Sequence, residues 1–257
     1  MDAEARGGAI AFLCAIEDAC AGRIERAPGG CAIVEPRHPR LWDANHLRVE
    51  APAAPDAVEL DAAARLHFGD LEFQMISVLH AAVGRALTAP LHSRGYRARH
   101  SLLMALASDP PAASPAEAAI SEISREQLAA TRIAGAVEGG LVDVEVGAQL
   151  VSRDALIATV VTERCFAVEG AGRQVAARCQ LYSKGHVAQI ENVYTVPAHR
   201  RRGFSRALVT HAAREARAAG ATLVFLVADA AGWPQAFYRR AGFVDRGLLP
   251  RFLRTRG

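Results

Sequence analysis

Apolar and polar residues alternate in blocks that predict an α/β organisation for the first part of the chain. An apolar stretch from Ala9 to Ile16, flanked by Glu17 and Asp18, is typical of an amphipathic helix. Beyond it, a period of two indicates strands and a period near 3.6 indicates helices. We expect strands over 30–35, 45–50, 71–78 and 99–107, and helices over 56–66 and 81–92.

The second part of the chain repeats this mixture with stronger signals. Gly170, Gly172 and Gly185 separate three β-type runs and suit tight antiparallel turns. Gly220 follows a strongly amphipathic run and marks a helix end. We expect strands over 118–123, 164–168, 174–182, 187–196, 222–228 and from 243 onward, and helices over 125–138, 142–155, 204–219 and 234–241. The predicted fold class is α/β (α+β), with mixed, mostly antiparallel sheets flanked by helices.

A proline-rich segment between these two parts predicts a domain boundary. Residues 108–115 read SDPPAASP, and prolines remove backbone donors and favour extended conformation. We therefore expect a linker at 108–116 between domains at 1–107 and 117–257.

The composition narrows the class of protein. Of 257 residues, 51% are hydrophobic and 22% charged, which is ordinary for a globular protein and excludes a disordered chain. No apolar run reaches the roughly 18 to 20 residues of a membrane-spanning helix, so we expect no membrane partner. Acidic residues near the start of the chain, where a secretory signal would be basic, favour a cytoplasmic protein.

Charge and cysteine content exclude further classes. The formal net charge is +3, and Lys184 is the only lysine among 30 basic residues. Because the arginine and alanine bias runs along the whole chain, we attribute it to a GC-rich bacterial genome and not to a nucleic-acid partner. The five cysteines are scattered, odd in number and never spaced C-x-x-C, so the sequence indicates neither a disulfide framework nor a metal site.

The segment from Thr195 to Leu208 carries the most specific chemical signal. A strand ends there, and a basic loop with Gly203 opens directly into a helix. The first turn of a helix offers unpaired backbone N–H groups and the positive end of the dipole, and glycine lets a diphosphate approach closely. Arg200, Arg201 and Arg202 add charged donors. The segment predicts an anion-binding loop; a solvated helix start and a nucleic-acid contact are the alternative interpretations.

The segment from Val187 to Phe243 resembles the acyl-CoA-binding half of the GNAT superfamily of CoA-dependent N-acyltransferases. In that family an apolar strand and a proline precede [QR]-x-x-G-x-[GA] at a helix start, and residues 200–205 (RRRGFS) fill this pattern. A buried strand and a helix ending in Tyr-x-x-x-Gly-Phe follow in the family, matched here by residues 238–243 (YRRAGF). Weaker similarity extends back to about Glu117. The resemblance implies a catalytic domain at 117–257 with acetyl-CoA as co-substrate.

By similarity, the contacts with the cofactor fall on the strand end and the following helix start. The backbone of residues 193–195 would hydrogen-bond the pantetheine arm and the thioester carbonyl, where this strand splays from the next. An N–H directed at that oxygen would stabilise the tetrahedral oxyanion. Amides of residues 201–206 would surround the pyrophosphate. The complete cofactor-binding set is Val193, Tyr194, Thr195, Arg200, Arg201, Arg202, Gly203, Phe204, Ser205 and Arg206.

The resemblance also supplies two catalytic candidates. Tyr238 would protonate the departing CoA thiolate; a tyrosine packed on the sheet is the alternative. Glu191 is the only titratable group on its face of the strand, by the period of two, and is our candidate general base. A structural or substrate-orienting role is its alternative, with water molecules carrying the proton. His186 and His199 are weaker candidates, more typical of surface loops.

Three positions depart from the family pattern. Ser205 stands where the family has glycine or alanine, and Thr195 stands where an apolar β-branched residue is commoner. Ala231 replaces an asparagine that many members carry seven residues before the tyrosine. We expect these departures to change the affinity for acetyl-CoA more than the fold.

The first half resembles the second only in part. It closes on a helix, Gly95-Tyr96 and a strand, but contains no counterpart of the Arg-x-x-Gly loop. We interpret it as a degenerate GNAT-like domain, which gives two such halves in tandem. The predicted function is transfer of an acetyl group from acetyl-CoA to a primary amine by direct attack in a ternary complex. A CoA-binding sensor or structural module without turnover is the alternative, and the sequence indicates neither the acceptor amine nor the oligomeric state.

Overall fold

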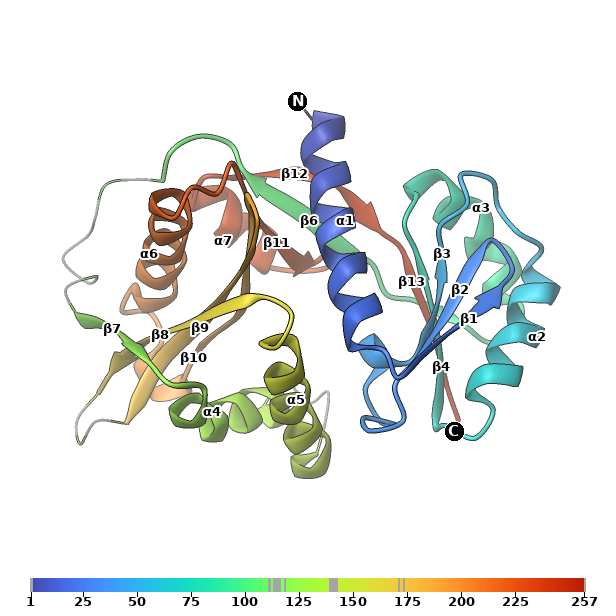
Figure 1. Cartoon of the computed structure of the whole chain (residues 1–257), viewed down its shortest axis with the longest axis horizontal. Helices are drawn as coiled ribbons and strands as arrows, with labels where there is room; N and C mark the ends of the chain where they lie inside the picture. The colour runs from blue at the N-terminus through green and yellow to red at the C-terminus, as the bar shows by residue number, and fades with distance from the viewer. Residues whose placement is uncertain are drawn as a thin grey trace. The chain divides into compact units, whose positions relative to one another are not determined.

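The computed structural model describes residues 2–110, 112, 117, 119–138, 143–170, 172 and 174–256 (Figure 1). The described part forms two mixed sheets and seven α-helices, which confirms the α/β prediction. The chain divides into two compact units. The seven-stranded unit comprises residues 1–12, 104–227 and 236–245, and the six-stranded unit comprises residues 13–103, 228–235 and 246–257.

The sheet of the seven-stranded unit has the order β12-β6-β11-β10-β9-β8-β7. Strands β7 to β10 pair antiparallel with their neighbours, whereas β10 and β11 pair in parallel. The strands are β6 (Ser101–Leu106), β7 (Ile120–Ile123), β8 (Thr162–Glu169), β9 (Val175–Lys184), β10 (Val187–Thr195), β11 (Leu223–Asp229) and β12 (Phe243–Leu249).

Helices cover both faces of this sheet. Neighbouring residues on a strand point to opposite faces, and on β9 Arg178 bonds to a carbonyl of α4 while Cys179 bonds to one of α6. Helices α4 and α6 therefore lie on opposite sides of the sheet, as Figure 1 shows. The helices that follow β7 in the chain are α4 (Arg125–Glu138), α5 (Val144–Ile157), α6 (Phe204–Ala218) and α7 (Pro234–Arg240), with the 3-10 turn η4 (Pro197–His199) before α6.

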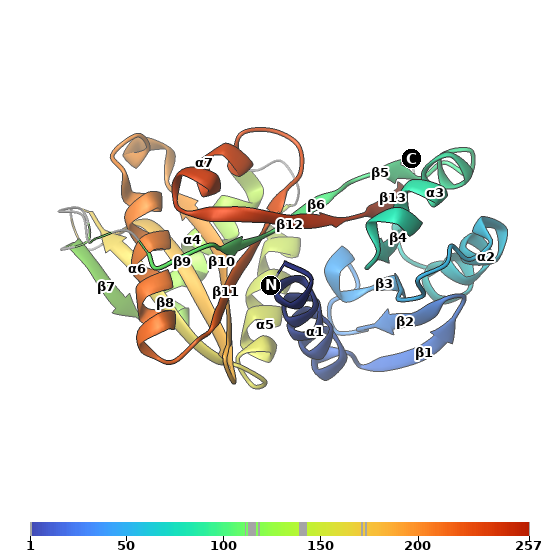
Figure 2. The same ribbon diagram turned by 90° about the horizontal axis from the view of Figure 1, so that it is seen from above.

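The six-stranded unit has the sheet order β1-β2-β3-β4-β13-β5. Its pairs are antiparallel except β3 and β4, which are parallel. Helices α2 and α3 pack beside each other on this sheet (Figures 1 and 2). The helix α1 (Asp2–Cys20) belongs to this unit from residue 13 on. The other elements are β1 (Arg23–Ala27), β2 (Gly30–Val34), η1 (Trp42–Ala44), β3 (His46–Val49), α2 (Ala57–Phe68), β4 (Phe73–Val78), α3 (Ala81–His92), β5 (Arg97–Ala98) and β13 (Arg251–Thr255).

The two sheets share one connection. In each, an antiparallel pair leads into a parallel strand–helix–strand crossover: β2-β3-α2-β4 in the six-stranded sheet and β9-β10-α6-β11 in the seven-stranded sheet. The internal resemblance predicted for the two halves therefore exists in the topology.

Membership of the sheets does not follow chain order throughout. Strand β6 precedes the predicted linker yet belongs to the seven-stranded sheet, and β13 at the end of the chain lies between β4 and β5. Most of the predicted linker at 108–116 lies outside the described residues, so the boundaries proposed for it stay a prediction. The strand predicted from 243 onward is broken at Pro250 into β12 and β13, because proline lacks the N–H that a ladder needs.

No helix in the described ranges is both long enough and apolar enough to cross a membrane.

Candidate functional site

A β-bulge on β10 lies at the centre of the predicted site. From Glu191 to Tyr194 β10 advances three residues, while its partner β9 advances two, from Gln180 to Arg178. The extra residue is accommodated with Asn192 at φ 54°, in the left-handed region that few residues other than glycine adopt. Such a bulge re-aims the backbone that follows it. That backbone belongs to Val193, Tyr194 and Thr195, the residues predicted to contact the pantetheine arm.

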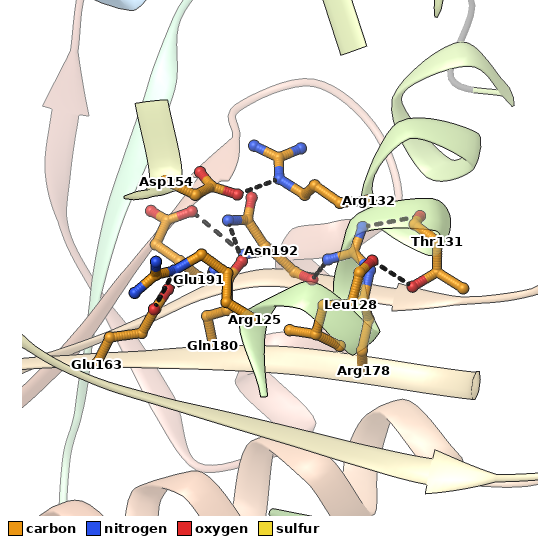
Figure 3. Close-up of polar contacts among 10 residues, drawn as sticks. All are labelled: Arg125, Leu128, Thr131, Arg132, Asp154, Glu163, Arg178, Gln180, Glu191 and Asn192. Carbon is orange, nitrogen blue, oxygen red and sulfur yellow. Dashed lines mark hydrogen bonds and ion pairs between the residues drawn. The ribbon is translucent and has the colours of Figure 1, made fainter. Parts of the chain in front are cut away.

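A buried arginine holds the bulge. Arg178 Nη1 donates to the carbonyl oxygen of Asn192 at 2.6 Å, and Nη2 donates to the carbonyl of Thr131 in α4 at 3.2 Å (Figure 3). Its guanidinium also lies 5.3 Å from the centre of the Tyr194 ring. Burial, and then the charge of Arg132, lower its pKa to about 10, so it stays charged at neutral pH. Arg178 thus ties the bulge carbonyl to α4.

The side chain of Asn192 is held from the other side by a polar chain across three strands. Asn192 Nδ2 donates to Gln180 Oε1 at 2.5 Å, and Gln180 Nε2 donates to Glu163 Oε1 at 2.7 Å (Figure 3). Arg125 completes the chain with an ion pair to Glu163 at 2.6 Å. Buried polar networks in which each member is bonded are rigid. The bulge is therefore fixed through both its main chain and its side chain.

Glu191, the predicted general base, borders the bulge. Its carboxylate accepts a short hydrogen bond from Gln189 Nε2 and a longer one, 3.3 Å, from the Asn192 backbone N–H. These two hydrogen bonds hold the carboxylate beside the bulge. The arrangement suits either of the two predicted roles, proton acceptor or substrate-orienting group.

The strand pairing opens at the same point. The parallel ladder between β10 and β11 comprises Val187, Ala188 and Gln189 opposite Leu223, Val224 and Phe225. Strand β10 continues six residues past the end of that ladder, to Thr195, and β11 continues to Asp229. The two strands thus part beyond Gln189. Backbone groups need hydrogen-bond partners, so the open edge of β10 can pair with an extended amide-containing chain.

The predicted anion loop follows directly. Proline begins the turn η4, Arg201 has φ 63°, and Gly203 has φ 80° at the N-terminal end of the 15-residue helix α6. A Cβ placed on Gly203 would meet no atom within 4 Å, so the space in front of this helix end is open. Open space, a left-handed glycine and the first-turn N–H groups of α6 together fit a diphosphate.

One of the three loop arginines bonds within the protein. Arg200 Nε donates to the carbonyl of Thr195 at 3.1 Å, and its guanidinium pairs closely with Glu138 at the end of α4. The other oxygen of Glu138 accepts from the Tyr194 hydroxyl at 2.6 Å. Gly135 permits this contact, because a Cβ there would lie 3.0 Å from the Tyr194 ring. Arg201 and Arg202 are exposed.

Tyr238, the predicted proton donor, lies on α7. Its ring packs edge-on against Phe237 and Phe243, with centroids 5.0 and 6.2 Å away. Burial raises the pKa of its phenol, and the negative charge of Glu191 raises it further. The phenol therefore remains protonated at neutral pH. The predicted acid and the predicted base lie close enough to influence each other electrostatically.

The two histidine alternatives lie away from the bulge. His186 precedes the first residue of β10, and its ring bonds to the carbonyl of Gly220 at 3.3 Å. His199 ends the turn η4, where its ring lies against Gly170. Among the described residues, no three His, Cys, Asp or Glu side chains are grouped to hold a metal ion.

The corresponding region of the six-stranded unit differs in two ways. The parallel ladder of β3 and β4 reaches the last residue of β3, Val49, and a bond from Leu79 N to its carbonyl extends it. Helix α2 is capped by Asp56, whose carboxylate accepts from Val58 N at 2.6 Å. These strands stay closed, and a carboxylate occupies the helix end where a phosphate would bind. This half therefore lacks both features that suit a CoA site.

The comparisons agree with this geometry. Residues 161–245 match the family described as acetyltransferase (GNAT) domain. A GCN5-related N-acetyltransferase from Kribbella flavida is 16% identical, with a TM-score of 0.62 over 97% of this chain and 95% of its own. A functionally unknown conserved protein from Staphylococcus epidermidis is 11% identical, with a TM-score of 0.63 over 92% of this chain and 95% of its own. No curated protein matches the sequence.

A tandem GNAT protein from the clavulanic acid biosynthesis pathway is also similar in fold. It is 13% identical, with a TM-score of 0.51 over 78% of this chain and 68% of its own. Residues 161–245 in the C-terminal half therefore match the GNAT acetyltransferase domain family, and the two sheets have the fold of tandem GNAT proteins.

Proposed function

We propose that this protein is an N-acetyltransferase that transfers the acetyl group of acetyl-CoA to a primary amine by direct attack in a ternary complex. The observation that carries the proposal is the opening between β10 and β11 beyond Gln189, immediately followed by the bulge and the Gly203 helix start. In this order they offer an edge for pantetheine amides, a redirected N–H for the thioester oxygen and a cradle for the pyrophosphate.

The reaction assigned to these groups has three parts. The neutral amine nitrogen attacks the thioester carbonyl carbon, and the oxyanion that forms accepts a hydrogen bond from the β10 backbone after the bulge. Collapse breaks the C–S bond and expels the CoA thiolate. Tyr238 donates its proton to that sulfur, and bulk water restores the phenol.

The amine proton also needs an acceptor. A primary amine is mostly protonated at neutral pH, so one proton leaves before attack and a second leaves the tetrahedral species. Glu191 is the proposed acceptor, directly or through water, because its carboxylate lies at the bulge. A carboxylate is a much weaker base than an amine, so relay of the proton through water to solvent is part of the proposal.

A thiol-release assay tests the proposal. Acetyl-CoA is incubated with the full chain and panels of polyamines, amino acids, aminoglycosides and peptides, and free CoA thiol is measured over time. We expect amine-dependent release with at least one class, and little release from the Tyr238→Phe variant. Tight, stoichiometric CoA binding without release for any amine class would instead support a CoA-binding sensor.

A further inference from the structure

A second anionic-ligand site is suggested by a pocket in the six-stranded unit. The pocket has a volume of about 590 Å³. It is lined by Arg65, Gly69, Gln74, Arg94, Arg254, Thr255 and Arg256. Four of these seven residues are arginines and none carries a large apolar side chain. Pockets for apolar ligands are lined mainly by hydrophobic and aromatic groups, so this pocket suits a charged ligand.

One of the arginines is held rigidly. Arg254 on β13 donates through Nε to Gln74 Oε1 at 2.7 Å and through Nη1 to the Arg94 carbonyl at 2.9 Å. Its Nη2 pairs with Asp61 at 2.7 Å, and its guanidinium stacks over the Tyr96 ring at 4.4 Å. These contacts use three of the five donors of a guanidinium, so two remain for a ligand. A fixed guanidinium loses little entropy when it binds.

The charges around the pocket are unbalanced. Asp61 is the carboxylate that contacts the lining, and it already bonds both Arg254 and Arg65, at 2.7 and 3.2 Å. Arg94 donates instead to the carbonyl of Pro90 at 3.2 Å. No carboxylate within the described ranges pairs with Arg94 or Arg256. Among the described residues, Asp61 is thus the one carboxylate that pairs with any of the four lining arginines.

Two other acids, Asp70 and Glu72, are close to lining residues in the sequence, but neither lines the pocket. Glu72 accepts the Arg256 backbone N–H through its carbonyl at 2.8 Å, but its carboxylate extends to Arg40 at 3.8 Å and does not line the pocket. The carbonyl end of α2 beside Gly69 offsets part of the positive charge. A clear excess of positive charge remains.

The location separates this pocket from a CoA-type site. Arg65 and Gly69 lie at the C-terminal end of α2, and Gln74 lies at the start of β4. The helix end that corresponds to the diphosphate cradle is the opposite one, where Asp56 caps α2. The pocket is thus not a remnant of the loop found in the other half.

We propose that this pocket binds a small organic anion that carries two or more negative charges on phosphate or carboxylate groups. Guanidinium forks match both groups in geometry, and several together favour a multivalent anion over a monovalent one. The volume falls within the roughly 300 to 1,000 Å³ of ordinary small-molecule sites. This site is independent of acetyl transfer.

Titration calorimetry with the full chain tests the proposal, with pyrophosphate and citrate as separate probes and acetate as the monovalent reference. We expect at least one probe to bind at least tenfold more tightly than acetate, and the preferred probe identifies the phosphate or the carboxylate class. Arg94→Gln and Arg256→Gln should each weaken binding at least tenfold. Arg85→Gln, an exposed arginine of α3 outside the lining, is the matched control and should leave binding unchanged.

The variants also separate this site from the loop before α6. Arg94 is half-buried and Arg256 is exposed. Thermal unfolding followed by circular dichroism verifies that each variant is folded. If neither probe binds more tightly than acetate, the proposal is wrong. It is equally wrong if binding survives both pocket substitutions but is lost in Arg202→Gln, because the anion would then occupy the α6 loop.

Discussion

The hydroxyl oxygens of Thr195 and Ser205 lie 2.6 Å apart, and this hydrogen bond joins the end of β10 to the first turn of α6. Both residues depart from the GNAT sequence pattern, and the structure makes them partners. The bond fixes the strand that would contact pantetheine relative to the helix that would contact the pyrophosphate. The two residues that depart from the family pattern thus form a hydrogen bond with each other.

Removing either hydroxyl should therefore give the same loss. We expect Thr195→Val and Ser205→Ala each to lower the free energy of unfolding by about 1 kcal/mol, the usual contribution of one hydrogen bond. The double variant should cost little more than either single one. Urea denaturation of the four proteins in a double-mutant cycle measures this coupling, and strictly additive losses would contradict it.

Substitution of Gly203 should weaken acetyl-CoA binding beyond its effect on stability. Gly203 and Gly220 lie at the two ends of α6 with φ 80° and 90°, and a Cβ on either would meet no atom within 4 Å. Alanine at either position should cost about 1 to 2 kcal/mol of backbone strain. Only Gly203→Ala should reduce acetyl-CoA affinity, by at least tenfold in calorimetry, because its Cβ enters the space assigned to the diphosphate. Equal acetyl-CoA affinities for Gly203→Ala and Gly220→Ala would show that the Gly203 loop does not bind the diphosphate.

Loss of Arg178 should also weaken acetyl-CoA binding, although the Arg178 side chain is itself buried. Arg178→Met deletes both carbonyl contacts, so the bulge loses its tie to α4 and affinity should fall at least tenfold. Arg178→Lys keeps the charge but cannot bond both carbonyls in the same way. Its acetyl-CoA affinity should lie between those of wild type and Arg178→Met. Arg164→Met is the control, because Arg164 of β8 pairs with Glu122 of β7 and with Glu215 in the last turn of α6, and neither partner belongs to the bulge. If Arg178→Met, like Arg164→Met, lowers stability but leaves acetyl-CoA affinity unchanged, the bulge is not held by Arg178.

The bounds of helices and strands were predicted well where the apolar periodicity agrees with glycine or proline residues at the ends of the element. The bounds of α3 and α4 match the predicted 81–92 and 125–138, and Gly203 lies at the predicted helix start. Strand β1 (RIERA) was not predicted, because its residues are mostly charged and exposed and only its pairing with β2 makes it a strand. The two-residue β5 is too short to give any pattern.

The side-chain contacts that hold the bulge on β10 could not be predicted. Arg178 and Gln180 stand out as polar residues within a buried strand, which is the signal that was available. Their partners depend on the register shift opposite Asn192. Register is read from the alternation of apolar and polar residues, and the two residues at the shift, Glu191 and Asn192, are both polar. The predicted roles of Tyr238 and Glu191 likewise stay predictions, since they concern a reaction and not a contact.

Replacement of Tyr238 by phenylalanine should separate proton donation from packing. The ring and its contacts with Phe237 and Phe243 are kept, while the hydroxyl is lost. We expect kcat and kcat/KM to fall together by roughly 10² or more, with little change in KM for acetyl-CoA. Tyr96→Phe is the matched control, because it deletes a buried hydroxyl that bonds Asp61 at 3.2 Å and should affect stability alone. A Tyr238→Phe enzyme with more than half the wild-type kcat would exclude the role.

Acid should destabilise the six-stranded unit through Asp61. Burial raises the pKa of this carboxyl, but hydrogen bonds from Arg65 and Arg254 outweigh burial and hold the pKa below its usual value. A carboxyl with a lower pKa in the folded state stabilises the fold above its unfolded pKa, and this contribution is lost as pH falls through the folded pKa. Wild type should therefore exceed Asp61→Asn in stability at pH 7, and the gap should narrow below about pH 4. A gap that stays constant down to pH 2 would contradict this assignment.

The position of β13 bears on how the chain is made. Its five residues lie between β4 and β5, yet they are synthesised after all the other strands that the structure describes. While a ribosome extends the chain, the inner edge of β4 stays without its neighbour until residue 255 has left the exit tunnel. This sheet cannot be completed before residues 251–255 have been made, and a nascent chain stalled or truncated before residue 251 would present an open edge to chaperones or to other nascent chains.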